Sequence, residues 1–79
     1  IPRWTLLADG SRISRQFKFR DFKAAMSFVN RVAEVAEYEG HHPDFAIHWD
    51  TVDHVLYTHK IGGLHENDFI MAAKIDRLA

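Results

Sequence analysis

The chain has 79 residues, of which 47% are hydrophobic and 13% aromatic, and this composition indicates one folded domain over residues 1–79 rather than a disordered segment. It contains no cysteine, which excludes disulfides, thiolate metal sites and thiol nucleophiles. Ten basic and eleven acidic side chains give a formal charge of -1, so direct binding of nucleic acid, which needs a strong positive excess, is not expected.

The size of the chain bears on its surroundings and its assembly. No apolar stretch approaches the roughly 20 residues that span a bilayer, so we expect no membrane contact and a soluble protein. The expected compartment is the cytoplasm, and the nucleus is considered as an additional one. Ordering costs about 1.5 kcal/mol per residue, and a core this small leaves little surplus stability. Since no disulfide can supplement that core, we expect a homo-oligomer.

The first third of the chain is predicted to form a β-hairpin. Residues 4–8 are a short apolar run, Asp9-Gly10 is a turn signal, and Ile13, Phe17 and Phe19 then alternate with polar residues. This third is also basic, with six basic and two acidic side chains in residues 1–23. An edge that binds an anion is one interpretation. The interpretation that we favour is that these side chains are solvated strand residues or form an interface with an acidic face of another subunit.

A long amphipathic helix is predicted between Asp21 and Gly40. Asp21 is a suitable N-cap and Gly40 a natural stop for a helix of about five turns. Apolar residues recur at helical spacing between them, and we expect this face to be buried. The residues of this face are Phe22, Ala25, Val29, Val32, Ala33 and Ala36.

A second hairpin is predicted after this helix. Pro43 favours an extended conformation at the residue before it. Phe45, Ile47 and Trp49 then occupy alternate positions, which point to one face of a strand. Residues 50–53 are predicted to form the turn, and residues 54–59 the returning strand. Aromatic side chains on a strand most often belong to a core, although Phe45 and Trp49 could also stack on a flat heterocycle.

The last predicted element is a helix. Gly62-Gly63 breaks the strand pattern, and acidic residues within 66–68 suit the positive end of a helix that carries Phe69, Ala72, Ala73 and Ile75. The order ββαββα predicts an α+β fold, a four-stranded antiparallel sheet with its helices packed on one face.

Histidines are the main candidates for chemistry, because six occur in this short chain. His41 and His42 are predicted to lie in the loop after the long helix and His59 at the end of the fourth strand, where functional groups tend to collect. Imidazole titrates near neutrality, so these side chains can donate and accept protons without a cofactor. An ordinary surface role is the favoured interpretation of the other three, His48, His54 and His65.

A zinc site is the weaker alternative for the same side chains. Its ligands would be His41, His59 and either Glu37 or Asp68, but no tight ligand spacing supports it. Because adjacent extended residues point to opposite sides, His41 and His42 cannot chelate one ion. No serine lies in a nucleophile motif, and no Gly-rich phosphate loop is present. We therefore expect acid/base chemistry without a metal or a cofactor.

The spacing of these residues resembles the signature of pterin-4a-carbinolamine dehydratase. Glu37, His41-His42-Pro43, Trp49, His59 and Asp68 fit the pattern E-x3-H-H-P-x5-W-x9-H-x8-D. Residues 17–28, Thr58 and Gly62-Gly63-Leu64 also resemble the family, so the resemblance covers nearly the whole chain. The family fold is a four-stranded antiparallel sheet with helices on one side. Its members usually have one more N-terminal helix, which we expect to be absent here.

Two positions differ from the family pattern. His65 stands where Thr or Ser commonly caps the last helix, and we expect this poorer N-cap to cost about 1 kcal/mol. Phe45 stands where Trp is frequent, which exchanges one aromatic side chain for another. Neither difference removes a proposed proton donor.

The resemblance implies a hydro-lyase that dehydrates 4a-hydroxytetrahydrobiopterin to quinonoid dihydrobiopterin. This reaction recycles tetrahydrobiopterin after aromatic amino acid hydroxylation and needs no cofactor. The resemblance implies that His41 and His59 act as general acids toward the departing hydroxyl and that His42 binds the pterin and assists as a base. It implies that further residues bind or orient the pterin: Glu37, Pro43, Asp44, Phe45, Trp49, Thr58 and Asp68.

The same family supplies a competing hypothesis. Animal members also serve as dimerisation cofactors of a homeodomain transcription factor, so a non-catalytic dimerisation module is the alternative function. A pterin-linked enzyme of another pathway is a third. All three signature histidines are present, which favours the dehydratase because an interface made by helices would not need them. The resemblance implies a dimer or tetramer whose partners are the pterin and either the hydroxylase pathway or a transcription factor.

Overall fold

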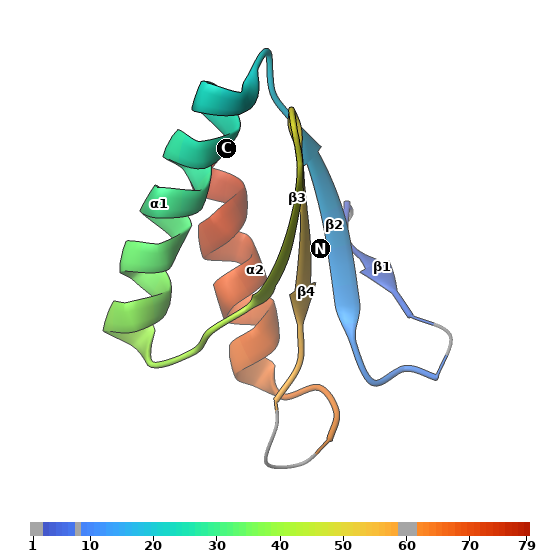
Figure 1. Ribbon diagram of the computed structural model, residues 1–79. Helices are drawn as coiled ribbons and strands as arrows, with labels where there is room; N and C mark the ends of the chain where they lie inside the picture. Colours follow the sequence, from blue (N-terminus) through green and yellow to red (C-terminus); the bar gives the residue numbers. More distant parts are fainter. Residues whose placement is uncertain (1–2, 8, 59–61) are drawn as a thin grey trace.

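The computed structural model describes residues 3–7, 9–58 and 62–79. Both helices lie on one face of a four-stranded antiparallel sheet whose strand order is β1-β2-β4-β3 (Figure 1). The predicted α+β fold and its order ββαββα are confirmed. The elements are β1 (Thr5–Leu6), β2 (Ile13–Lys18), α1 (Phe22–Glu39), β3 (Asp44–His48), β4 (Thr51–Leu56) and α2 (Glu66–Leu78).

Strand register decides which side chains face the helices. β4 lies between β2 and β3, so Val52 has Phe17 on one side and Ile47 on the other, and Leu56 faces Ile13. Alternate residues of β4 are fully buried, as the two-residue period of a strand requires when one face is covered. In the described part of the chain, no helix covers the other face of the sheet (Figure 1).

Both ends of α1 are set by local interactions, as predicted. The Asp21 carboxylate accepts a hydrogen bond of 2.7 Å from the backbone N–H of Ala24. At the other end Gly40 has φ 65° and donates its N–H back to the last turn of the helix. A left-handed conformation strains any residue with a Cβ, so glycine is suited to this position.

The buried face of α1 differs in part from the prediction. Phe28 is fully buried although the prediction omitted it, whereas Phe22 is half exposed and Ala33 is exposed. Helix rows three and four residues apart lie next to each other, and the row that contains Phe28 faces the sheet. Phe22 and Ala33 lie beside this row, at the edge of the buried face of the helix, and are therefore exposed. The buried residues of α1 are Ala25, Phe28, Val32 and Ala36.

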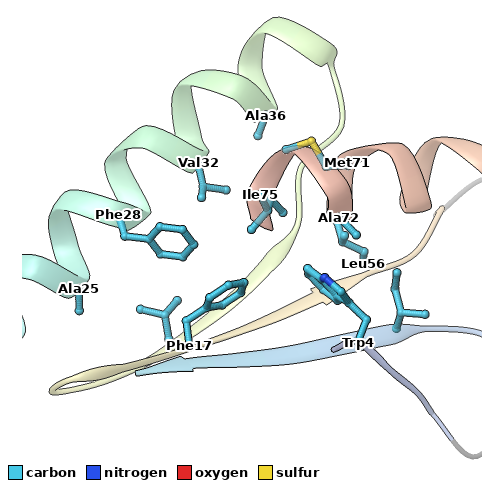
Figure 2. Packing of buried hydrophobic residues seen from close by; sticks show 12 residues of the cluster. Trp4, Phe17, Ala25, Phe28, Val32, Ala36, Leu56, Met71, Ala72 and Ile75 are labelled. Atoms are coloured by element: carbon cyan, nitrogen blue, oxygen red, sulfur yellow. The ribbon is translucent and has the colours of Figure 1, made fainter. Parts of the chain in front are cut away.

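The core lies between the helices and the sheet. Figure 2 shows the Phe17 and Phe28 rings facing each other across this layer, and their centroids lie 4.8 Å apart. From α2, Met71, Ala72 and Ile75 complete the cluster. Full burial of a large apolar side chain stabilises a fold by about 1.5–3 kcal/mol, so this cluster holds the two layers together.

The second hairpin is tighter than predicted. Residues 51–53 were assigned to the turn, yet β4 begins at Thr51 and only Trp49 and Asp50 connect the strands. Two contacts with the end of β2 hold this short turn, because the Asp50 carbonyl accepts from the N–H of Phe19 and its carboxylate pairs with Lys18 at 2.8 Å. Trp49 therefore lies in the turn and not in the strand, with φ 55°.

The first hairpin follows the prediction with a shorter first strand. β1 comprises only Thr5–Leu6, and the Asp9-Gly10 turn follows. The Asp9 carboxylate accepts hydrogen bonds from the side chain and the backbone N–H of Ser11, and these bonds lower the pKa of Asp9. A local side-chain interaction thus closes this turn.

Several basic side chains of the first third find acidic partners within the chain. Arg15 pairs with Asp76 at 2.6 Å, and Arg20 lies 3.7 Å from its neighbour Asp21. These pairs give part of the basic segment acidic partners within the chain, an arrangement that the sequence analysis did not consider. Within the described residues, neither helix is long and apolar enough to cross a membrane.

Candidate active site

The loop after α1 directs its two histidines to different partners. The N–H of His41 donates to the Ala36 carbonyl at 3.0 Å, which anchors the loop to the end of the helix. His41 Nε2 then lies 2.6 Å from Asp68 Oδ1, and His42 Nε2 lies 3.2 Å from Glu37 Oε1. This divergence agrees with the predicted opposite orientations of adjacent extended residues.

Asp68 is a fully buried carboxylate at the start of α2. Besides His41 on Oδ1, it accepts two bonds on Oδ2, from Thr58 Oγ1 and from the N–H of His65, both at 2.9 Å. A buried carboxylate is costly unless donors surround it, so these three bonds compensate for the burial of Asp68. The arrangement joins three separate segments of the chain.

Asp68 also determines how His41 can act. An ionised carboxylate only accepts hydrogen bonds, so His41 Nε2 must carry the shared proton. This leaves Nδ1 as the nitrogen through which the ring exchanges a proton with a ligand. The His41 side chain is 18% exposed, which keeps it accessible while its partner is buried. A histidine held in this way is suited to general acid/base catalysis.

A small pocket of about 190 Å³ lies beside His41, between the end of α1 and the start of α2. It is smaller than the roughly 300–1,000 Å³ of sites that enclose a drug-sized ligand, so a flat ligand bound here would stay partly open to solvent. The residues that line it are Glu39, Gly40, His41, Asn67, Ile70 and Met71. The sequence analysis did not assign Asn67 or Met71 to a site, although both lie within one helical turn of Asp68.

His42 and Glu37 form a more exposed pair on the other side of the loop. Their side chains are 61% and 80% exposed, so solvent screens the interaction and its contribution to stability is small. The pair nevertheless orients His42 at the same end of the molecule as His41. Pro43, which follows, is buried and fixes the direction in which the chain enters β3.

Of the other predicted site residues, Asp44 and Phe45 follow this loop at the start of β3, and Trp49 comes just after the far end of that strand. Asp44 alternates with the helix-facing residues of β3 and lies on the uncovered side of the sheet, while the Phe45 ring packs 4.6 Å from the His54 ring. Trp49 is 71% exposed, and at about 3.3 Å per residue it lies roughly 16 Å from Asp44. Figure 1 shows the β3–β4 turn at the end of the molecule opposite to the α1–β3 loop.

The third signature histidine, His59, lies outside the described residues. The zinc alternative depended on it in combination with His41 and an acid. Among the described residues, no group of three or more His, Asp or Glu side chains could hold a metal ion.

His65 occupies the N-cap position that the sequence analysis gave it, whereas the burial of His54 was missed. His65 caps α2, with Nδ1 accepting from the N–H of Asn67 at 3.2 Å. His54 was interpreted as a surface residue, but it is fully buried and neither ring nitrogen has a hydrogen-bond partner. Burial lowers the pKa of His54 to about 4. Its alternation with Val52 and Leu56 on one strand was the signal that could have revealed its burial.

Comparison with known proteins agrees with the signature. The sequence profile described as "Pterin 4 alpha carbinolamine dehydratase" matches residues 1–78. Proteins of Aromatoleum aromaticum and Halorhodospira halophila, both named "Putative pterin-4-alpha-carbinolamine dehydratase", are 58% and 56% identical over 78 residues. Each alignment covers 99% of this chain, and 70% and 72% respectively of the relative.

Solved structures give the same result for the fold. A transcriptional coactivator/pterin dehydratase from Brucella melitensis superposes with a TM-score of 0.92 at 36% identity. The alignment covers 98% of this chain and 82% of the Brucella chain. A pterin dehydratase-like protein described as a RuBisCO assembly factor in the alpha-carboxysome superposes with a TM-score of 0.83 over 96% and 88% of the two chains, and at 22% identity it supports the fold alone. By the profile match and by its relatives, the chain belongs to the pterin 4-alpha-carbinolamine dehydratase family.

Proposed function

We propose that this protein is a hydro-lyase that dehydrates 4a-hydroxytetrahydrobiopterin to quinonoid dihydrobiopterin. The observation that carries the proposal is the pairing of His41 with the buried Asp68 beside a pocket, since it supplies a proton donor of defined orientation. Membership of the family supports the pterin as the substrate. In this role the protein would recycle tetrahydrobiopterin after aromatic amino acid hydroxylation.

The reaction requires one acid and one base. His41 Nδ1 donates a proton to the hydroxyl oxygen on C4a, and the C4a–O bond breaks with release of water. The electron pair on N5 forms the C4a=N5 double bond, while the N5 proton passes to His42 as the base. Asp68 orients His41 through Nε2 during the transfer, and Glu37 orients His42. Each acid/base group of this kind contributes about 10²–10⁴ in rate.

The proposal assigns roles to the remaining signature residues on the basis of the family resemblance. His59 acts as a second acid. Pro43, Asp44 and Phe45 shape the side of the site next to His42. The resemblance also assigns Trp49 to the site, although in this chain it lies at the other end of β3 from the histidine pair.

The direct test is the dehydration rate of freshly generated 4a-hydroxytetrahydropterin, followed by ultraviolet absorbance. We expect wild-type protein to accelerate the reaction over buffer and His41→Ala and His59→Ala each to lose at least about 10² of that acceleration. His48→Ala is the matched control, because His48 is an exposed histidine on β3 that pairs with Asp53 at 3.4 Å. A folded wild-type sample without acceleration would contradict the proposal, as would full activity of His41→Ala.

A non-catalytic assembly role is the second candidate. The Brucella melitensis relative is described as a transcriptional coactivator as well as a dehydratase, and the helices of this chain expose Tyr38 (88%), Phe69 (43%) and Ile70 (46%). A folded sample that does not accelerate dehydration but binds a partner protein through these side chains would favour this role. Complex formation unaffected by His41→Ala would support the same conclusion.

We also propose that the protein is a homo-oligomer. β3 is an edge strand on which Phe45 and Ile47 are each 37% exposed, and exposed apolar edge strands are commonly covered by another chain. Sedimentation at micromolar concentration is expected to show a dimer or a tetramer. A folded monomer under these conditions would contradict this proposal without affecting the proposed chemistry.

A further inference from the structure

Thr58 lies at the centre of contacts that its assignment to pterin binding does not explain. Its N–H donates to the Gly63 carbonyl at 2.7 Å, which connects the residue after β4 to the segment that leads into α2. Its hydroxyl donates to Asp68 Oδ2 at 2.9 Å. Both donors of Thr58 are therefore directed toward the start of α2.

A hydroxyl has a single proton to donate. Because Thr58 gives that proton to Asp68, it cannot donate a hydrogen bond to a bound pterin in the same state. We propose that Thr58 is a positioning residue, whose hydroxyl holds the Asp68 carboxylate in the orientation that presents Oδ1 to His41. This inference rests on the proposed function for its effect on rate, but the contact on which it depends exists in the free protein.

The environment of Asp68 explains why one hydroxyl matters. The carboxylate is fully buried and its donors come from three segments: the loop after α1, the residue after β4 and the N-cap of α2. Without Thr58 Oγ1, Oδ2 keeps only the His65 N–H among these donors, and the carboxylate can rotate about its Cβ–Cγ bond. His41 Nε2 then loses a fixed acceptor, and the direction of Nδ1 changes with it.

Proton transfer is sensitive to such a change, since displacement of a catalytic group by about 1 Å can cost on the order of 10² in rate. The displacement expected here is smaller. We therefore expect Thr58→Val, which keeps the shape and removes the hydroxyl, to lower kcat about tenfold with KM nearly unchanged. Thr58→Ser, which keeps the hydroxyl, should restore kcat to within about twofold.

Thr51→Val is the matched control. It removes a threonine hydroxyl at the opposite end of β4, where Thr51 Oγ1 donates to the His48 carbonyl at 3.1 Å, and it leaves the Asp68 contacts intact. Its kcat and KM should equal those of wild type. Should Thr58→Val fail to fold by circular dichroism, Thr58→Ala removes the same hydroxyl without adding bulk and takes its place.

A second measurement tests the contact without using activity. Long-range ¹H–¹⁵N spectra of the free protein report the ring nitrogens of His41, and we expect their signals to move in Thr58→Val but not in Thr58→Ser or Thr51→Val. If wild type fails to accelerate dehydration while these shifts occur, the proposed function fails and the positioning role stands.

Three outcomes would overturn the inference. Unchanged His41 signals in Thr58→Val would show that Thr58 does not position the ring. A raised KM with unchanged kcat would show that the hydroxyl binds substrate. Failure of Thr58→Ser to restore kcat would show that the methyl group, through packing, is the part that matters.

Discussion

His54 is a buried histidine without a hydrogen-bond partner for either ring nitrogen. Its ring packs against Phe17, Phe28 and Phe45 at centroid distances of 5.4, 5.5 and 4.6 Å. The charged groups near this position are Asp53, the preceding residue of β4, whose side chain points to the uncovered face, and Arg15, opposite in β2, whose guanidinium is engaged by Asp76. Burial dominates and lowers the pKa to about 4, since the apolar site disfavours the imidazolium.

The lowered pKa makes the stability of the fold depend on pH. The unfolded chain protonates His54 near pH 6.5 but the folded chain only near 4, so stability is fully present above pH 6.5 and is lost as pH falls toward 4. The shift corresponds to a loss on the order of 3 kcal/mol in the free energy of unfolding. We expect urea unfolding at pH 7 and pH 4, followed by circular dichroism, to show it.

His54→Leu should remove this part of the pH dependence and raise the free energy of unfolding at pH 7 by about 1–3 kcal/mol, because no polar atom remains unsatisfied. His48→Gln, which removes an exposed imidazole from β3, should keep the wild-type pH dependence. Equal pH profiles for wild type and His54→Leu would show that another group is responsible.

The start of α2 shows how a helix cap and a site share one residue. His65 Nδ1 accepts from the N–H of Asn67 at 3.2 Å, and the Asp68 carboxylate accepts from the N–H of His65 at 2.9 Å. The two bonds satisfy backbone donors at the beginning of the helix. The same carboxylate holds His41, so the cap and the candidate catalytic group are mechanically connected.

His65→Ala should lower the free energy of unfolding by about 1 kcal/mol, because the side-chain acceptor of the cap is lost. His65→Ser should be at least as stable as wild type, since the shorter hydroxyl is a preferred N-cap. Thermal denaturation followed by circular dichroism measures both. Asn67→Ala keeps the backbone donor and serves as the control, and equal stability of His65→Ala and this control would argue against a capping role for the imidazole.

At the scale of the whole molecule, Asp76 connects the sheet to α2. Its carboxylate accepts from Trp4 Nε1 at 2.9 Å and from Arg15 Nη1 at 2.6 Å. The Arg15 guanidinium also lies 4.1 Å from the centre of the Phe17 ring. Because β1 is only two residues long, we infer that these contacts, more than its strand pairing, hold the N-terminal segment to the core.

Asp76→Ala should lower the free energy of unfolding by about 2 kcal/mol, as expected for the loss of charged hydrogen bonds at a partly buried site. Hydrogen exchange of the β1 amides should become faster in the same variant. Asp53→Ala is the control, because Asp53 pairs with Gln16 on the uncovered face of the sheet and should change stability by less than about 1 kcal/mol. Equal losses in the two variants would contradict a special role for Asp76.

Features that depend on neighbours in the chain could be predicted without a structure. The α1 caps at Asp21 and Gly40 follow from the preferences of single residues, and both are confirmed. The alternation of apolar side chains indicated the strands, and the divergence of His41 and His42 followed from the geometry of adjacent residues. The order ββαββα and the family were therefore accessible from the sequence.

The tertiary structure decided which distant residues meet. Asp68 lies 27 positions from His41 and ten from Thr58, and only the packing of α2 beside α1 and the sheet brings the three together. Strand register buried His54, and the two-residue turn placed Trp49 at the opposite end of β3 from the histidine pair. Local propensities determine the elements, but contacts between distant segments depend on register and packing, to which every residue of the core contributes.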